Sequence, residues 1–131
     1  MNLQDELDSI SNRYDVSTQK HRKDTICKDG FKISIQASSN HYCTPQKDGI
    51  DTIYTHVELG FPSERDNLID TYVEDLSKED EEIEYTKSVY PWVPAQVVSL
   101  LIAKHGGWVD GSLPKLGLVV EHIVRMPIMR G

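Results

Sequence analysis

The sequence predicts an α+β fold: a small antiparallel sheet of about three to four strands with two to three helices packed on one face. Several short segments alternate apolar and polar residues between turn dipeptides, which is typical of antiparallel strands. Other segments repeat apolar residues every three or four positions, as amphipathic helices do. The strands do not alternate regularly with long crossover helices, so we do not expect a parallel, doubly wound sheet.

The chain is long enough for one hydrophobic core. It has 131 residues, of which 38% are hydrophobic and 27% charged, and this size and composition are typical of one globular domain. Polar residues without a period at 15–25 predict a linker, which gives an N-terminal helix and linker at residues 1–25 and a single α+β domain at residues 26–131. The helix is predicted over residues 3–14 by the spacing of Leu3, Leu7, Ile10 and Tyr14.

Two strands are predicted in the first half of the domain. The turn dipeptide at Asp29 and Gly30 precedes an alternating strand over residues 31–38. Its core face is expected to hold Phe31, Ile33, Ile35 and Ala37, and its opposite face Lys32, Ser34, Gln36 and Ser38. A second strand over residues 53–59 is expected to place Ile53, Thr55, Val57 and Leu59 on one face and Tyr54, His56 and Glu58 on the other.

Two further strands are predicted later in the chain. Residues 88–93 form one of them, and because Pro91 cannot donate a hydrogen bond to a sheet, we expect it at an edge or a bulge. Residues 116–124 are rich in β-branched side chains and predict the last strand.

Two helices are predicted within the domain. Ser63 and Asp66 have the spacing of a helix start, followed by a helical stripe, which predicts a helix over residues 64–76. The second helix, over residues 95–105, follows Pro94 and ends at the glycine pair Gly106 and Gly107, which suits a left-handed stop. We expect the apolar face of this second helix to cover the sheet.

The charge and the lack of long apolar runs limit the partners. The formal net charge of -7 disfavours direct binding to nucleic acid or to an anionic membrane. No run approaches the roughly 20 apolar residues that a membrane helix needs, so we expect a cytoplasmic protein with two reduced, buried thiols, Cys27 and Cys43. The N-terminal helix could pair with another chain, which leaves a homo-oligomer open.

Two kinds of reactive site are possible from the residue types. His41 and Cys43 lie two positions apart and could form a tetrahedral zinc site with Cys27 and His105, although the chain has no Cys-x-x-Cys or His-x-x-x-His pair. Cys43 could also act as a nucleophile with His41 as its base, as in a cysteine-dependent hydrolase. Because no catalytic motif is present, we expect a protein that is not an enzyme and that needs no cofactor.

Aromatic side chains beside a polar strand face predict a binding groove. Tyrosine and tryptophan combine a flat apolar ring with a polar tip, which suits contact with a small molecule or a partner side chain. The candidate ligand-binding residues are Gln36, Ser38, His41, Tyr42, Glu58, Phe61, Tyr90 and Trp92. The acidic segment over residues 74–84 is a second candidate, because clustered carboxylates can meet a basic surface.

Five motifs resemble a family of small uncharacterised bacteriophage proteins. They are CxDGFxISIQAS from Cys27, HYCxP from His41, VELGFPS from Val57, VYPWVP from Val89 and KHGG from Lys104. The resemblance covers about residues 26–107 and implies a phage accessory protein that acts in the host cytoplasm.

By analogy, such a protein counters host defence by binding a small nucleotide-like signal or by blocking a host protein. For a small ligand, we expect contacts from the loop at residues 41–47 and from Phe61, Tyr90 and Trp92. For a host protein, we expect the acidic segment at residues 74–84 to meet a basic surface.

Overall fold

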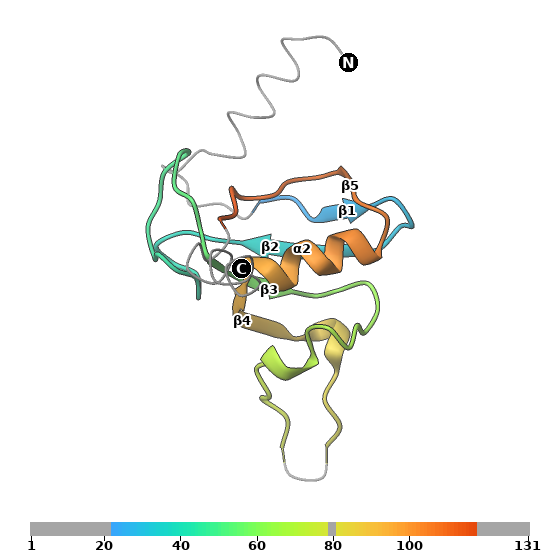
Figure 1. Cartoon of the computed structure of the whole chain (residues 1–131). Coiled ribbons are helices and arrows are strands. Elements are labelled where there is room, and N and C mark those ends of the chain that lie inside the picture. The colour runs from blue at the N-terminus through green and yellow to red at the C-terminus, as the bar shows by residue number, and fades with distance from the viewer. Residues whose placement is uncertain (1–21, 79–80, 118–131) are drawn as a thin grey trace, which may run out of the picture.

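A computed structural model describes residues 22–78 and 81–117 and shows one antiparallel sheet of five strands (Figure 1). The order of the strands across the sheet is β4-β3-β2-β1-β5. Their bounds are β1 (Thr25–Cys27), β2 (Lys32–Gln36), β3 (His56–Gly60), β4 (Val89–Pro94) and β5 (Trp108–Asp110). The described residues also form the α-helix α2 (Ala95–Lys104) and two short 3-10 helices, η1 (Asp70–Tyr72) and η2 (Tyr85–Lys87).

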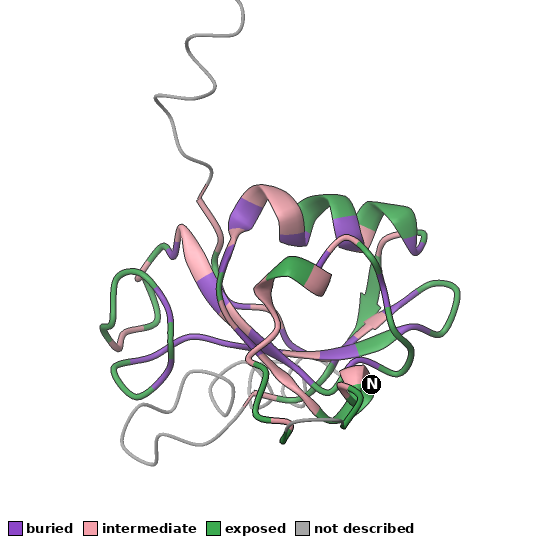
Figure 2. Cartoon of the chain, turned by 90° about the horizontal axis from the view of Figure 1, so that it is seen from below, coloured by how far each residue is buried: buried purple, intermediate pink, exposed green. Residues whose placement is uncertain are grey.

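The helix α2 carries the chain from one edge of the sheet to the other. Strands β1 to β4 are neighbours in chain order, but β5 lies beside β1, so the connection after β4 must cross four strand spacings, about 19 Å. A helix of 10 residues is about 15 Å long. It therefore covers most of one face of the sheet, as two perpendicular views show (Figures 1 and 2).

The core lies between α2 and this face of the sheet, where buried residues gather (Figure 2). As predicted, residues 31, 33, 35 and 37 are all buried. They pack with side chains from β3, β4, α2 and the segment before η1, namely Val57, Leu59, Tyr90, Val93, Val98, Leu101 and Ile69. Each fully buried side chain of this kind contributes about 1.5 to 3 kcal/mol.

The expected α+β class holds, but the described residues contain more strands and fewer helices than predicted. The helix predicted over residues 64–76 is wrong, because this segment contains only the three-residue turn η1. The Asp66 carboxylate accepts the Leu68 N–H instead of starting a helix. After η1, the chain extends and the Glu74 N–H donates to the Val89 carbonyl, so pairing beside β4 replaces helical hydrogen bonds.

Two strands were missed because each has only three residues and too little alternation to detect. They are β1 and β5, and Thr25 of β1 lies in the region predicted as a linker. The strand predicted over residues 53–59 starts only at His56. Before His56, the inward and outward side chains are the reverse of those expected. Tyr54 is buried and Ile53 is 58% exposed, because the Tyr54 backbone pairs with Lys115 and Gly117 and lies outside the sheet.

The other predictions divide into confirmed and untested ones. The helix α2 ends as predicted, since Gly106 and Gly107 have φ angles of 91° and 102°. Pro91 lies on the edge strand β4 at an irregular register, also as predicted. The helix over residues 3–14 and the part of the last strand beyond Gly117 lie outside the described residues. Within the described part of the chain, no helix is long and apolar enough to span a membrane.

A buried imidazole joins three segments at the end of α2. His105 stacks on Phe31, with 3.9 Å between ring centroids. Its Nδ1 lies 2.7 Å from Asp29 Oδ2 in the turn between β1 and β2, and its Nε2 lies 2.8 Å from Asp66 Oδ2 in the loop after β3. Lys104 Nζ lies 3.1 Å from Asp66 Oδ1. We call His105, Asp29 and Asp66 the histidine clamp.

The clamp favours a charged imidazole between two charged carboxylates. Burial disfavours the charged imidazole, but the hydrogen bonds to Asp29 and Asp66 outweigh it and raise the pKa of His105 above 6.5. Burial opposes ionisation of Asp66 too, yet the Leu68 N–H and the neighbouring His105 and Lys104 lower its pKa below 3.8. The Phe31 N–H and then His105 lower the pKa of Asp29.

These shifts set the pH range in which the clamp stabilises the fold. The contribution of His105 is complete below its ordinary pKa of 6.5 and is lost as the pH rises through its higher folded value. The contribution of Asp29 and Asp66 is complete above their ordinary pKa of 3.8 and is lost as the pH falls through their lower pKa values in the folded state. We therefore expect the clamp to act most strongly between these two limits.

Replacing the imidazole by a ring that cannot donate hydrogen bonds tests this account. His105→Phe keeps a ring on Phe31 but leaves the buried Asp66 without that partner, so we expect a loss of about 3 kcal/mol in the free energy of unfolding at pH 6. The control Lys104→Ala removes a half-exposed ion pair and should cost less than about 1 kcal/mol. In urea unfolding between pH 4 and 9, the free energy of unfolding should fall at alkaline pH in the wild type only. The same fall in His105→Phe would contradict the clamp.

Candidate functional site

The four residues of the predicted zinc site lie in two groups at opposite ends of β2. Cys27 and His105 lie near the start of β2, where the Asp29 N–H donates to the His105 carbonyl. His41 and Cys43 lie in the loop after β2. Nowhere in residues 22–78 and 81–117 do three or more His, Cys, Asp or Glu side chains form a group that could hold a metal ion.

A buried hydrogen-bond network fixes the loop after β2. Ser38 Oγ lies 2.6 Å from His41 Nδ1, and the Cys43 thiol donates to the carbonyls of Ser38 and Pro45 at 3.1 and 3.3 Å. Burial raises the pKa of Cys43 above 9.0, partly offset by its hydrogen bond to the Ser38 backbone. A thiolate nucleophile needs the opposite shift, so the arrangement suits a structural role that holds Tyr42 in place.

Gln36, on the polar face of β2, is covered by the chain itself. Gln36 is 2% exposed, and its amide accepts from the Arg22 N–H at 2.8 Å and donates to the Arg22 carbonyl at 2.9 Å. These two hydrogen bonds resemble the pair that the backbone of a neighbouring strand would form with Arg22. Gln36 therefore anchors the segment before β1, which the sequence did not indicate.

A bulge in β4 changes the surface of the sheet next to Glu58. Val57 pairs with Val93 and Leu59 pairs with Tyr90, so two residues of β4 lie opposite the single residue Glu58. These two are Pro91 and Trp92. Because a bulge turns side chains away from the regular alternation, Trp92 is exposed while Tyr90 and Val93 of the same strand stay in the core.

Three of the predicted ligand-binding residues meet at this bulge. The Trp92 N–H donates to the Tyr42 carbonyl at 3.1 Å, and the Tyr42 N–H donates to Glu58 Oε1 at 3.1 Å. The rings of Tyr42 and Trp92 lie 5.0 Å apart with 39° between their planes. The two side chains are 44% and 46% exposed. We call Tyr42, Glu58 and Trp92 the aromatic site.

The backbone of the aromatic site is strained. Trp92 has a φ angle of 48°, and Phe61, with 51°, is the other non-glycine residue with positive φ in the described ranges. This conformation brings Cβ close to the following carbonyl and costs roughly 1 to 2 kcal/mol. Such strain is often found at functional sites, and both residues carry exposed aromatic rings.

The remaining predicted residues do not join the aromatic site. Phe61 follows the end of β3, where its N–H donates to the Ser88 carbonyl. Tyr90 is buried, its hydroxyl donates to the Tyr85 carbonyl at 2.6 Å, and burial raises its pKa to about 12. Ser38 and His41 are also buried and bond to each other.

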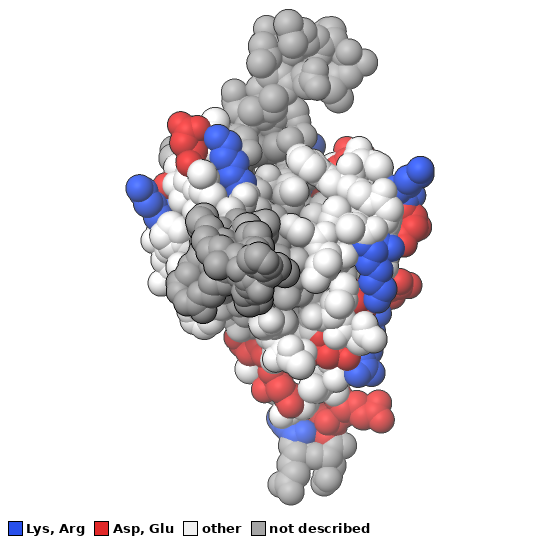
Figure 3. All heavy atoms as spheres, in the orientation of Figure 1, with Lys and Arg blue, Asp and Glu red and all other residues white. Residues whose placement is uncertain are grey.

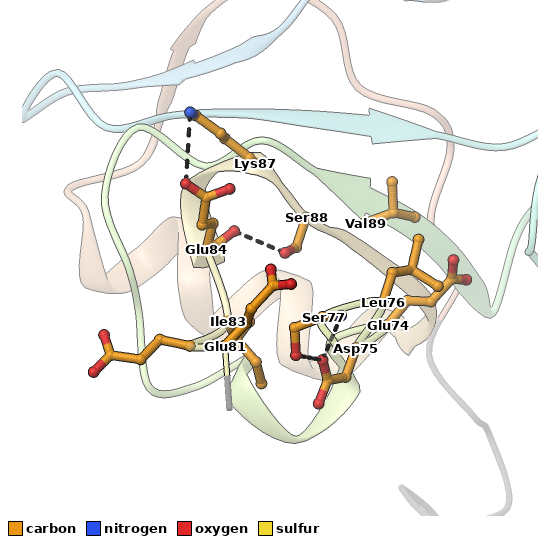
Figure 4. A pocket seen from close by; sticks show the side chains of 11 residues that line it. Glu74, Asp75, Leu76, Ser77, Glu81, Ile83, Glu84, Lys87, Ser88 and Val89 are labelled. Atoms are coloured by element: carbon orange, nitrogen blue, oxygen red, sulfur yellow. Dashed lines mark hydrogen bonds and ion pairs between the residues drawn. The ribbon is translucent and has the colours of Figure 1, made fainter. Parts of the chain in front are cut away.

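The acidic segment forms an arm that extends from the sheet. In Figure 3, acidic side chains gather at the lower end of the molecule on this arm, over residues 74–89. They line a hollow of about 250 Å³ together with Leu76 and Ile83 (Figure 4). Glu84 pairs with Lys87 at 3.6 Å, and both side chains are at least 70% exposed. Acidic residues 79 and 80 lie outside the described residues.

Comparisons with protein-family models, curated proteins and solved structures found no match to this chain. The assignment of the site therefore depends on its geometry.

An edge or a bulge was predicted at Pro91, and β4 has both features, but the sequence also holds a more direct signal for the bulge. The only predicted cause was Pro91, which lacks an N–H. The more direct signal is that two large core residues of one strand, Tyr90 and Val93, are three positions apart, which strict alternation cannot bury on one face. The contact between Trp92 and Tyr42 could not be inferred, because it joins residues from distant segments.

A comparison of glycine and alanine at position 92 tests the strain. Both variants lose the ring contact, but only glycine accepts a positive φ without penalty. We expect Trp92→Gly to be more stable than Trp92→Ala by about 1 kcal/mol in urea unfolding. The matched pair at Trp108, an exposed tryptophan on β5 without positive φ, should show the reverse order. Greater stability of the alanine variant at both positions would refute the strain.

Proposed function

We propose that this chain is a non-enzymatic binding protein that recognises a partner protein through the aromatic site. The observation that carries this proposal is the pair of touching, half-exposed rings of Tyr42 and Trp92 on a strained, hydrogen-bonded backbone. The resemblance to phage proteins suggests a host protein as the partner and a role in countering host defence in the host cytoplasm.

The energetics of the aromatic site favour binding over a purely structural role. Trp92 gives up about half of its possible burial and adopts a backbone conformation that opposes folding. A side chain kept only for stability would be expected in the core. Tryptophan and tyrosine are enriched among the residues that contribute most to protein interfaces. Their positions here are fixed in advance by Glu58 and the loop after β2, which limits the entropy lost on binding.

The position of the site favours a protein over a small nucleotide-like signal. Small ligands are usually bound in concave pockets that cover most of their surface, whereas Trp92 lies on the edge strand β4. Three hollows in the described structure, on the arm, beside Lys104 and around residues 47–52, are lined by other residues. The net charge of -7 also opposes phosphate groups.

The two tryptophans of the chain allow a matched test. The full chain, Trp92→Ala and Trp108→Ala would each be used to capture proteins from host-cell extract, and the captured candidate would then be purified and titrated against all three. We expect Trp92→Ala to weaken binding by about 2 kcal/mol, roughly thirtyfold, as for a central interface residue. Trp108→Ala, with a similar exposure of 43%, should bind like the wild type.

Equal binding by Trp92→Ala and the wild type would refute the proposal. Thermal unfolding of each variant serves as the folding control. If no protein binds but a small molecule stays with the wild type in a native mass spectrum and leaves Trp92→Ala, the ligand is a small signal and the protein partner is excluded.

A further inference from the structure

We infer that the aromatic site binds a cationic side chain of its partner, an arginine whose guanidinium lies over the Trp92 ring and pairs with the Glu58 carboxylate. This inference rests on the proposed function, because it names the chemical group that the aromatic site recognises. It follows from the charge at the site, from the faces of the rings and from a similar arrangement elsewhere in the same chain.

The Glu58 carboxylate is placed to receive a cation. It is half-buried on β3, and one of its oxygens accepts the Tyr42 N–H at 3.1 Å. That bond orients the carboxylate beside the bulge, and within the described residues its second oxygen accepts no hydrogen bond. Among the residues that the structure describes, no lysine, arginine or histidine forms an ion pair with Glu58. Within residues 22–78 and 81–117, the site therefore holds a negative charge that no ion pair neutralises.

The rings next to this carboxylate also favour a cation. The faces of tryptophan and tyrosine are electron-rich and attract Lys, Arg or ligand cations, with tryptophan the strongest. Trp92 and Tyr42 lie in contact at the surface. Tyr42 contacts the Trp92 ring and also donates its N–H to Glu58, so the rings and the carboxylate are neighbours that attract the same charge, and their effects add.

An aromatic ring and a carboxylate already share one guanidinium at the base of the arm. The Arg65 guanidinium lies 4.0 Å from the centre of the Tyr85 ring, and its Nη2 lies 3.0 Å from Asp70 Oδ2. Arg65 thus satisfies an aromatic face and a carboxylate together. The aromatic site offers the corresponding acceptors without such a cation in the described part of the chain.

Arginine fits these acceptors better than lysine does. Its guanidinium is planar, so it can stack on an indole while its edge donates two hydrogen bonds to a carboxylate. A lysine ammonium is a compact point charge with a larger hydration penalty. A guanine base has a similar planar donor edge, but its phosphates would meet a chain with a net charge of -7.

Titration with a single arginine unit tests the inference without knowledge of the partner. The probe is N-acetyl-arginine amide, and the control is N-acetyl-citrulline amide, which has a similar shape but no charge. Binding to the full chain would be followed by the indole N–H signals of the two tryptophans in NMR spectra. We expect a saturable shift at Trp92 with a millimolar Kd, an affinity about fivefold lower for the citrulline probe, and no shift at Trp108.

The variant Glu58→Gln provides the second arm of the test. It keeps an oxygen that can accept the Tyr42 N–H but removes the charge, so arginine should bind it more weakly than it binds the wild type, while the remaining attraction to the ring face keeps its affinity at or above that of citrulline for the wild type. Equal binding of arginine and citrulline, or full arginine binding by Glu58→Gln, would overturn the inference. So would a shift of Trp92 with guanosine monophosphate but not with arginine, which would point to a nucleotide-like ligand.

The two proposals can fail separately. If arginine does not bind but Trp92→Ala still loses the partner protein, the aromatic site binds a protein through another group. If Trp92→Ala keeps the partner, the proposed function itself is wrong, whatever the titration shows.

Discussion

The exposed surface of the sheet depends on a mismatch in the spacing of buried residues on two neighbouring strands. Leu59 and Val57 of β3 are two positions apart, but their partners on β4, Tyr90 and Val93, are three positions apart. A regular strand cannot bury both partners on one face. The bulge supplies the extra residue, and the outward position and strained backbone of Trp92 follow from it.

Two different networks hold the ends of β2 and thereby support the aromatic site. At the start of β2, the histidine clamp joins the β1–β2 turn, the loop after β3 and the end of α2 through charged groups. After β2, hydrogen bonds of Ser38, His41 and Cys43 fix the loop that carries Tyr42. The first network makes stability depend on pH, whereas the second holds one half of the ring pair in place. The acidic arm lies outside both networks.

The sequence predicted those parts of the fold that depend on local pattern. The core face of β2, the helix α2 with its glycine stop, and the irregular edge position of Pro91 all follow from periodicity or from the chemistry of one residue. The helix over residues 64–76 failed, because Asp66 has a tertiary partner that no local pattern reveals.

The candidate site was predicted only as a set of residue types. Tyr42, Glu58 and Trp92 were in that set, but five other members were not separable from them by sequence. Gln36 was expected to face a ligand, yet it pairs with the backbone of Arg22. Contacts between segments distant in the chain decide which polar residues remain available, so the members of the site could not be inferred from sequence.

A double-mutant cycle on Tyr42→Ala and Trp92→Ala tests most directly whether these two residues form one site. Urea unfolding should give a coupling energy of about 0.5 to 1.5 kcal/mol between them, and additive effects of the two substitutions would contradict a single site.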